Sequence, residues 1–396
     1  MSYPDDAAWI AATGPSRSID DNRVLDNPVL DNRVLDNPVP NNPALDNPVF
    51  DSTGTDPLAE EAAGVEEAIA GFRPADDDDL VSVAPDLAAV APQGSGPPAQ
   101  DTPAEQEVVP ALIAKPAPVT AELGPTGRPG RHIPEPAALT SHGPARVIAL
   151  CNQKGGVGKT TSTLNLGAAL AGYGRRVLLV DFDPQGALSA GMGVPSHELD
   201  RTIYNLMLER DTTITDVLVP TRVENMDLLP ANIDLSAAEV QLINEVGREH
   251  TLTRALRPML HEYDYILIDC QPSLGLLTVN ALACAHGVIM PVAAEFFSLR
   301  GVALLVDTID KVKDRINPDL HIDGVLVTMF DGRTVHARDV VAMLVQRFGD
   351  DVYDTVISRT VKFPETTVAG EPITSYAPTS AAAEAFRTLA REVIAR

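Results

Sequence analysis

The sequence is poor in cysteine, in aromatic residues and in long apolar runs. Three cysteines occur among 396 residues, and none has the spacing of a metal-ligand set, so small buried thiols in a reducing compartment are expected. No apolar run approaches the length of a membrane-spanning helix. The N-terminus also lacks the positive region and the apolar core of a signal peptide. These absences together predict a cytoplasmic protein.

Basic residues are fewer than acidic ones, and the imbalance is concentrated in one part of the chain. The formal net charge is −25, and residues 1–145 hold 24 acids against 7 bases. Such a balance argues against a protein that binds nucleic acid over its whole surface, although a local basic patch is compatible with it. The length of 396 residues is enough for two average domains, but α/β domains run large.

Residues 1–144 have the composition of a disordered, acidic, Pro/Ala-rich extension. Six five-residue units fill residues 21–50, and proline at the third position of four of them removes a strand hydrogen-bond donor each time. Disorder is therefore favoured over a stacked repeat, with an interaction repeat as the alternative. A short acidic helix could form at 59–72, and an acidic run follows at 76–79. The turn-rich segment 124–129 is a candidate for docking on the folded domain.

One stretch organises the rest of the chain. It runs from Val147 to Thr161 with the sequence VIALCNQKGGVGKTT. An apolar, partly β-branched strand leads into a glycine-rich turn and then into a helix whose apolar residues recur at helical spacing. Such a loop directs several backbone N–H groups and a helix N-terminus at one point, which makes a phosphate-binding site. Lys159 is placed to reach the β- and γ-phosphates of a nucleotide, and Thr160 to ligate Mg²⁺.

The loop departs from the ordinary P-loop pattern. Gln153 occupies the position of the first glycine, and an additional lysine, Lys154, opens the sequence K-G-G-x-G-K-T. In this respect the chain resembles the ParA/MinD-type ATPases with a deviant Walker A motif, and among them the chromosomal, Soj-like ParA proteins. The resemblance implies ATP hydrolysis, with ATP and Mg²⁺ as cofactors. It also implies that Lys154 reaches across a homodimer, formed in the ATP state, to the partner's nucleotide. The nucleotide-binding residues would be Gly155, Gly156, Val157, Gly158, Lys159, Thr160 and Thr161.

Two further motifs supply carboxylates at the ends of predicted buried strands. The strand at 176–181 runs into DFDPQG, and the strand at 265–269 ends in an aspartate, as in a Walker B motif. The carboxyl ends of parallel strands lie beside the P-loop, where ligands bind in open α/β sheets. By resemblance, Asp183 positions or deprotonates the attacking water, whereas Asp181 and Asp269 support Mg²⁺. The catalytic residues implied by the resemblance are Lys154, Lys159 and Asp183.

The residues after the Walker B aspartate depart from the family. The family pattern is D-x-P-P, and this chain has Asp269-Cys270-Gln271-Pro272. Gln271 lies near the switch II turn, so the sequence determines the speed of hydrolysis less well than it determines nucleotide binding. A protein that holds ATP and barely hydrolyses it is therefore one alternative function.

Basic residues at family-matched places predict contact with DNA. Arg333 falls in a D-x-R-T segment, and Arg359 and Lys362 fall where the relatives carry R-x-V-R. By resemblance, these residues would bind DNA without sequence preference. Such contacts neutralise phosphates, so binding would fall steeply with salt. Ordinary solvated surface charge is the alternative for each residue.

The remaining pattern supplies further strands and helices. Apolar runs at 288–292, 322–329 and 352–357 predict strands, and helical spacing predicts helices at 335–348 and 380–396. The segment 227–235 resembles a family segment at the dimer face. A helix is expected after it, with one face formed by Ala238, Leu242 and Val246. The C-terminal helix lacks the spacer and the lysine cluster of membrane-binding relatives, so it is expected to dock on the core.

Residues 145–396 are expected to form one ParA-type α/β domain of the P-loop NTPase class. Its sheet would be doubly wound and mostly parallel, with helices on both faces. The family implies a nucleoid-associated ATPase of chromosome or plasmid partitioning, with a homodimer, non-specific DNA and a ParB-like activator as partners and with no membrane. The main alternative is the same ATPase positioning a protein complex of division or polar growth, with the acidic extension as adaptor.

Overall fold

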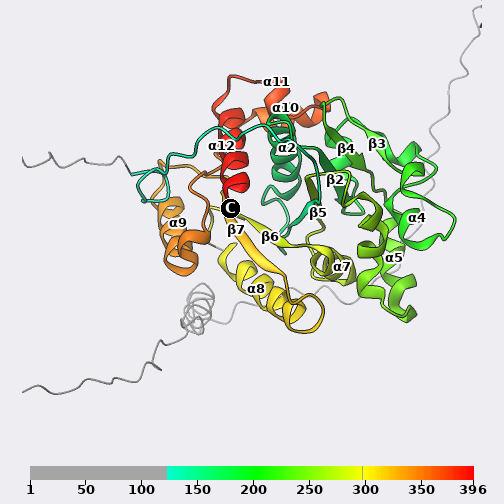
Figure 1. Ribbon diagram of the computed structural model, residues 1–396. Coiled ribbons are helices and arrows are strands. Elements are labelled where there is room, and N and C mark those ends of the chain that lie inside the picture. Colours follow the sequence, from blue (N-terminus) through cyan, green and yellow to red (C-terminus); the bar gives the residue numbers. More distant parts are fainter. Residues whose placement is uncertain (1–122, 297) are drawn as a thin grey trace, which may run out of the picture. The chain divides into compact units, whose positions relative to one another are not determined.

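The computed structural model describes residues 123–296 and 298–396, and Figure 1 shows the path of this part of the chain. The predictions for the repeats at 21–50, the helix at 59–72 and the acidic run at 76–79 lie outside the described residues. From Arg146 onward, strands and helices alternate as the sequence predicts.

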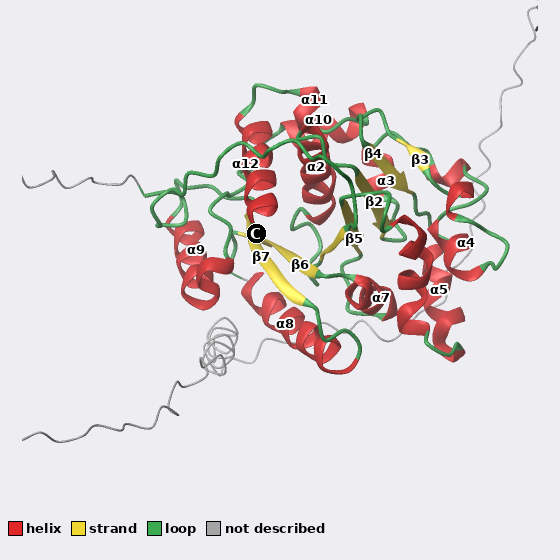
Figure 2. Ribbon diagram, viewed as in Figure 1, coloured by secondary structure: helices red, strands yellow, loops and turns green. Residues whose placement is uncertain are grey.

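A seven-stranded sheet lies at the centre of the described chain (Figure 2). Its strand order is β3-β4-β2-β5-β1-β6-β7. The strands are β1 (Arg146–Leu150), β2 (Val177–Phe182), β3 (Val219–Pro220), β4 (Met226–Leu229), β5 (Tyr265–Cys270), β6 (Gly287–Ala293) and β7 (His321–Thr328). Every neighbouring pair is parallel except β3 with β4. The predicted doubly wound, mostly parallel sheet is confirmed.

Helices cover both faces of this sheet (Figure 2). They are α2 (Lys159–Gly172), α3 (Ala187–Gly191), α4 (Ile203–Leu208), α5 (Leu235–Gln241), α6 (Thr251–Leu256), α7 (Leu276–Cys284), α8 (Ser298–Arg315), α9 (Val335–Phe348), α10 (Lys362–Ala369), α11 (Ile373–Tyr376) and α12 (Ala381–Ala395). Successive side chains of β1 point to opposite faces. Val147 and Ala149 join a core with α5 to α9, whereas Ile148 and Leu150 join a core with α2 and α12. Burial on both faces explains why these strands are continuous apolar runs.

The order in which the chain adds strands to the sheet reverses at strand β1, with β2 to β5 on one side of it and β6 and β7 on the other. It pairs with β5 on one side and β6 on the other, with Leu150 opposite Asp269 and Ile289. In the next pair of strands, Asp181 of β2 lies opposite Asp269 of β5. The carboxyl ends of β1, β2 and β5 therefore meet at one edge. In open α/β sheets, ligands bind at such an edge.

The prediction of a strand at 352–357 is wrong, although the segment does run along β7. The N–H of Tyr353 donates to the carbonyl oxygen of Val325 at 3.0 Å, and the N–H of Ile357 donates to that of Val327 at 2.8 Å. Between these two contacts, the N–H groups of residues 354 and 355 both donate to the carboxylate of Glu392 on α12 at 2.8 Å. The side chain from α12 interrupts the ladder, so only isolated bridges form.

The predicted helical face after Leu235 is shorter than its spacing indicates. Helix α5 ends at Gln241, and Leu242 opens a short 3₁₀ turn. Val246 lies beyond that turn and is 96% exposed, so its predicted placement on one helical face with Ala238 and Leu242 is wrong. The chain changes direction at Gly247, whose φ of +66° favours glycine.

The two ends of the described chain both pack on the domain. The turn-rich segment docks as expected, and it belongs to a longer segment, residues 123–143, which we call the N-terminal strap. Arg128 of the strap donates to the carbonyl oxygen of Gly349 at 2.8 Å. The expected docking of α12 is also confirmed, because Phe386 and Leu389 are fully buried. No helix within 123–296 or 298–396 is long and apolar enough to cross a bilayer.

Candidate nucleotide site

The loop between β1 and α2 has the backbone conformation that a phosphate-binding loop requires. Gly156 and Gly158 have φ of +72° and +84°, where a side chain would be strained. A Cβ added at Gly155 or Gly156 would meet no atom within 4 Å, so space lies open beside the loop. The N-terminus of α2 has no side-chain cap and no acid in its first turn, which suits it to an anionic ligand.

Two side chains hold the loop in place. Asn152 Nδ2 donates to the carbonyl oxygen of Pro291 on β6 at 2.7 Å, and its Oδ1 accepts from the N–H of Lys154 at 2.9 Å. Thr328 Oγ1, at the end of β7, donates to the carbonyl oxygen of Val157 at 2.7 Å. The sequence prediction missed both residues. Asn152 adjoins the motif and could have been noticed, whereas Thr328 is brought there only by the fold.

Lys159 and Thr160, the first residues of α2, project toward the inside of the site. Lys159 Nζ donates to the carbonyl oxygen of Lys154 at 3.3 Å, so this side chain spans the loop. Lys159 is only 7% exposed. Thr160 Oγ1 donates to Asp269 Oδ2 at 2.6 Å, which joins the helix start to the end of β5. The structure thus brings together Thr160 and Asp269, two residues that the sequence analysis assigns to Mg²⁺ and that lie 109 positions apart.

Asp181 and Asp269 are buried carboxylates on neighbouring strands. Ser189 donates two hydrogen bonds to Asp181 Oδ2, one from its Oγ at 2.6 Å and one from its N–H at 2.8 Å. Burial, together with the charge of Asp181, raises the pKa of Asp269 to about 8. Burial also raises the pKa of Asp181 to about 7. A cation bound beside them would favour the ionised form of both acids.

This arrangement fits Mg²⁺ better than a metal held by protein ligands alone. Mg²⁺ keeps several waters and uses one or two carboxylates together with phosphate oxygens. Asp269 and the Thr160 hydroxyl lie at the start of the phosphate-binding helix, where such a shared ion belongs. In the part of the chain that the structure describes, no three His, Cys, Asp or Glu side chains gather as a metal-ligand set.

Asp183 follows the end of β2 and lies at the opening of the site. It is partly exposed, and its Oδ1 accepts from the N–H of Gln185 at 3.0 Å. This hydrogen bond fixes the turn that leads into α3. The carboxylate is thereby held near Asp181 but with access to solvent, which a group acting on water requires.

Lys154 turns away from its own phosphate loop. Its Nζ donates to Glu295 Oε2 at 2.8 Å and to Ser298 Oγ at 3.3 Å, beyond the end of β6. The hydrogen bond from Lys154 lowers the pKa of Glu295. The Lys154 side chain is 35% exposed, so it lies at the rim of the site. Glu295 and Ser298 belong to no recognisable sequence motif, and the sequence prediction did not include them.

A cavity of about 430 Å³ opens beside the phosphate loop. Its walls come from the start of α2, the end of β7 and the segment 357–367, and they include Gly158, Thr161, Met329 and Phe363. The volume is within the range of small-molecule pockets. Since Gly158 and Thr161 belong both to the loop and to the cavity, one ligand with a phosphate chain and a flat organic group can occupy both.

The basic residues expected to contact DNA lie on two neighbouring segments. Arg333 Nε and Nη2 donate to the two carboxylate oxygens of Asp331 at 2.9 and 2.7 Å. Arg359 Nη2 lies 3.4 Å from Glu295 Oε1. An isolated bridge joins the loop before α9 to the segment before α10, where Lys362 is the first helical residue. The side chains of Arg333 and Arg359 are 90% and 68% exposed.

Gln271, the departure from the family pattern, points to a neighbouring helix. Its Nε2 donates to Glu239 Oε1 on α5 at 3.1 Å. The same carboxylate oxygen accepts from the N–H of Leu277 at 3.2 Å. Glu239 therefore links α5 to Gln271 in the turn after β5 and to the start of α7.

The parallel sheet, the glycine loop and the carboxylates at the strand ends define a P-loop NTPase. Comparison with known sequences agrees. Residues 145–322 match the model of an AAA domain family. An uncharacterized protein of Mycobacterium tuberculosis (strain ATCC 25618 / H37Rv) is 70% identical over 274 residues, which cover 69% of this chain and 86% of that protein. The sporulation initiation inhibitor protein Soj of Bacillus subtilis (strain 168) is 46% identical over 250 residues, which cover 63% of this chain and 98% of Soj.

Solved structures show the same fold. Cobyrinic acid a,c-diamide synthase from Mycobacterium smegmatis, with bound ADP and magnesium, has a TM-score of 0.55 and 42% identity, over 62% of this chain and 92% of that one. The cell division ATPase MinD of Pyrococcus furiosus has a TM-score of 0.52 and 28% identity, over 63% of this chain and 99% of that one. The chain belongs to the family of ParA/MinD-type ATPases and is close to its Soj-like members.

Proposed function

We propose that this chain is a Mg²⁺-dependent ATPase that dimerises on ATP and acts in chromosome or plasmid partitioning. The observation that carries the proposal is the position of Lys154, which lies at the rim of the site and pairs with Glu295 at 2.8 Å. An exposed ion pair contributes only about 0–1 kcal/mol, so little free energy opposes its exchange for another anion. In a face-to-face dimer that anion is the phosphate chain bound by the second subunit.

ATP binds in two parts. Residues 155–161 hold the phosphates through backbone N–H groups and the start of α2, and Lys159 contacts the β- and γ-phosphates. The cavity beside Gly158 holds the nucleoside. Thr160 and Asp269 would hold Mg²⁺, and Asp181 would support it through water. When bound, Mg²⁺ neutralises charge on the phosphate oxygens.

Hydrolysis needs groups from both subunits. Asp183 orients the attacking water or accepts its proton at the opening of the site. Lys154 of each subunit stabilises the charge that develops on the partner's γ-phosphate, so turnover depends on dimerisation. Because this geometry forms only in the dimer, a ParB-like activator can accelerate hydrolysis by stabilising it.

The dimer binds DNA of any sequence through Arg333, Arg359 and Lys362. Contacts of this kind go to phosphates and carry no sequence information. Two subunits double the number of contacts, which makes binding depend on the ATP state. The protein would therefore associate with the nucleoid in the cytoplasm and leave it after hydrolysis.

DNA binding in different nucleotide states tests the proposal. The chain is incubated with a duplex of arbitrary sequence at low salt with ADP, with ATP, and with ATP after Arg333→Glu/Lys362→Glu. Binding is expected only with ATP and only without the charge reversals. The matched control is Lys313→Glu/Arg315→Glu at the end of α8, two exposed bases that do not belong to the predicted DNA-binding set.

Two outcomes would redirect the proposal. A folded protein that dimerises with ATP but binds no DNA in any nucleotide state would favour the positioning of a protein complex instead. A protein that releases less than one phosphate per monomer, even with DNA and a partner present, would favour an ATP-holding switch.

A further inference from the structure

We propose that the N-terminal strap is a positioning element of the nucleotide site. Arg128 and Arg131 hold the start of the segment 349–360, and the end of that segment forms one wall of the cavity beside the phosphate loop. The strap precedes residues 145–322, which match the AAA domain model, so the ATPase motifs themselves do not include it. The inference rests on the proposed function, because it takes this cavity as the site of the ATP nucleoside.

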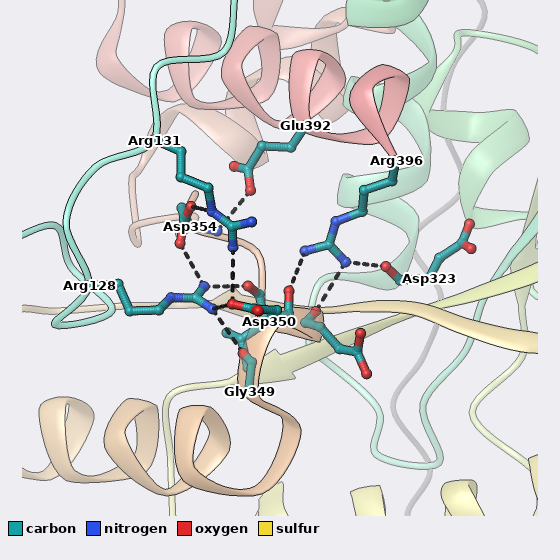
Figure 3. A network of polar contacts seen from close by, with 10 residues as sticks. Arg128, Arg131, Asp323, Gly349, Asp350, Asp354, Glu392 and Arg396 are labelled. Carbon is teal, nitrogen blue, oxygen red and sulfur yellow. Dashed lines mark hydrogen bonds and ion pairs between the residues drawn. The ribbon is translucent and has the colours of Figure 1, made fainter.

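Two arginines of the strap contact the start of the segment (Figure 3). Arg128 donates to the carbonyl oxygen of Gly349 at 2.8 Å and also to that of Val352. Its guanidinium lies 2.6 Å from Asp354 Oδ1, and both side chains are 18% exposed. Arg131 Nε donates to the other carboxylate oxygen of Asp354 at 2.8 Å. The contact between Arg128 and Asp354 is largely buried, and charge-assisted contacts of this kind are stronger than surface ion pairs, whereas the Arg131 side chain is 52% exposed and contributes less.

Helix α12 also holds the same segment (Figure 3). The Glu392 carboxylate accepts from the N–H groups of Asp354 and Thr355, both at 2.8 Å. The Arg396 guanidinium lies over the Tyr353 ring, 4.0 Å from its centroid. Asp354 therefore has its backbone fixed by α12 and its side chain fixed by the strap.

The segment passes from this clamp directly to the cavity. Its next backbone contact with β7 is the N–H of Ile357, which donates to Val327 at 2.8 Å. Ile357 and the three residues after it then line the cavity. An extended chain spans at most about 3.5 Å per residue, so Asp354 lies within about 10 Å of Ile357, the first residue of the wall. The wall residues also have backbone hydrogen bonds to the chain after β7, because the N–H of Phe330 donates to the carbonyl oxygen of Ile357 at 3.1 Å and the N–H of Arg359 donates to that of Phe330 at 3.4 Å. The clamp acts together with these bonds by fixing the residues that lead into the wall.

Nucleotide affinity of the full chain tests the inference. The dissociation constant of a fluorescent ATP analogue with Mg²⁺ is measured well below the unfolding temperature for wild type, Arg128→Ala and Arg128→Lys. Arg128→Ala is expected to weaken binding about 3- to 10-fold, the size of effects transmitted through packed neighbours, and Arg128→Lys less. The amides of Ile357 and Arg359 should also exchange hydrogen faster in Arg128→Ala than in wild type.

Glu135→Gln is the matched control. It removes a different contact of the strap, the ion pair with Arg391 at 2.7 Å, and leaves the contacts of Arg128 with the segment intact. Affinity is expected to remain at the wild-type value. If Arg128→Ala does not fold, Asp354→Asn weakens the same ion pairs while keeping the backbone contacts.

The outcomes separate this inference from the proposed function. A folded Arg128→Ala or Asp354→Asn variant with wild-type affinity would overturn the inference and leave the ATPase proposal standing. Equal weakening by Glu135→Gln would also overturn it, because the effect would then be general destabilisation. A wild-type chain that binds no nucleotide would reject the proposed function itself, and the inference with it.

Discussion

The two lysines of the phosphate loop have the same side chain but different surroundings. Lys159 is 7% exposed, and its Nζ lies 3.3 Å from a carbonyl oxygen across the loop. Lys154 has a side chain that is 35% exposed and pairs with Glu295 at the rim. A buried ammonium inside the loop serves the subunit's own ligand, whereas an ammonium at the rim is available to a neighbouring molecule.

Substituting each lysine by glutamine should separate binding from turnover. Lys159→Gln is expected to abolish nucleotide binding, because the loop loses its internal positive charge. Lys154→Gln should leave binding to the monomer close to wild type but lower turnover about 100-fold or more, the usual effect of removing one transition-state contact. Binding of an ATP analogue and phosphate release per monomer measure the two effects. Wild-type turnover in Lys154→Gln would contradict the assigned role.

His286 makes the fold sensitive to mild acid. Its Nδ1 accepts from the N–H of Val147 at 2.9 Å. Burial, followed by the charge of Arg146, lowers the pKa of His286. The unfolded chain therefore takes up this proton first, so stability falls as the pH drops below about 6.5 toward the lower folded pKa. Above about pH 7 the ring is neutral in both states and makes no such contribution.

A His286→Asn variant, which keeps an acceptor but does not titrate, tests this effect. Urea midpoints are measured at pH 7.5 and pH 5.5. Wild type should lose more stability over that range than the variant, because only the wild-type side chain must remain uncharged in the fold. Equal losses in the two proteins would show that other groups determine the acid sensitivity.

The start of α2 depends on a glycine that no other residue replaces without strain. Gly158 caps the helix with φ of +84°. Gly158→Ala should lower the free energy of unfolding by about 1–2 kcal/mol, the cost of a left-handed alanine, and should weaken nucleotide binding. Gly172→Ala, at the other end of α2 and with nothing within 4 Å of the added Cβ, is the control. It should be neutral or slightly stabilising in denaturant unfolding. Similar losses in both variants would argue against strain at the loop.

Glu392 on α12 stabilises the segment beside β7. It is 5% exposed and accepts two backbone N–H groups at 2.8 Å. Glu392→Gln replaces one acceptor oxygen by an NH₂ group that faces a donor, which should cost about 1–3 kcal/mol of unfolding free energy. Glu384→Gln, an exposed neighbour on α12, should cost less than about 1 kcal/mol in the same urea titration. A Glu392→Gln variant as stable as the Glu384→Gln variant would contradict this role.

The elements that the sequence predicts correctly are those encoded by contiguous residues. The strand, loop and helix of Val147–Thr161 adjoin one another, and the structure forms them in that order. The strand predicted at 352–357 fails because Glu392, far away in the sequence, takes two of its N–H groups. The contacts of Thr328 and Glu295 with the loop were missed for the same reason, since only the fold brings them there.

At the scale of the whole molecule, two exposed arginines lie on adjoining segments of an acidic chain. The formal net charge is −25, yet Arg333 and Arg359 lie on adjoining segments and are largely exposed. Hydrogen bonds from Arg333, with a smaller contribution from the charge of Arg359, lower the pKa of Asp331 to about 2. These exposed ion pairs are weak, so DNA phosphates can compete with Asp331 and Glu295 for the two guanidinium groups.

The salt dependence of DNA binding should reveal how many of these residues take part. Arg333, Arg359 and Lys362 of two subunits offer about six phosphate contacts, so affinity in ATP should fall about 10³-fold between 50 and 200 mM salt. Arg333→Ala removes one contact per subunit and should make the slope of log affinity against log salt less negative by about 2. Arg315→Ala, on an exposed residue at the end of α8, should leave the slope unchanged. If Arg333→Ala keeps the wild-type slope, Arg333 makes no phosphate contact and the DNA-binding surface lies elsewhere on the domain.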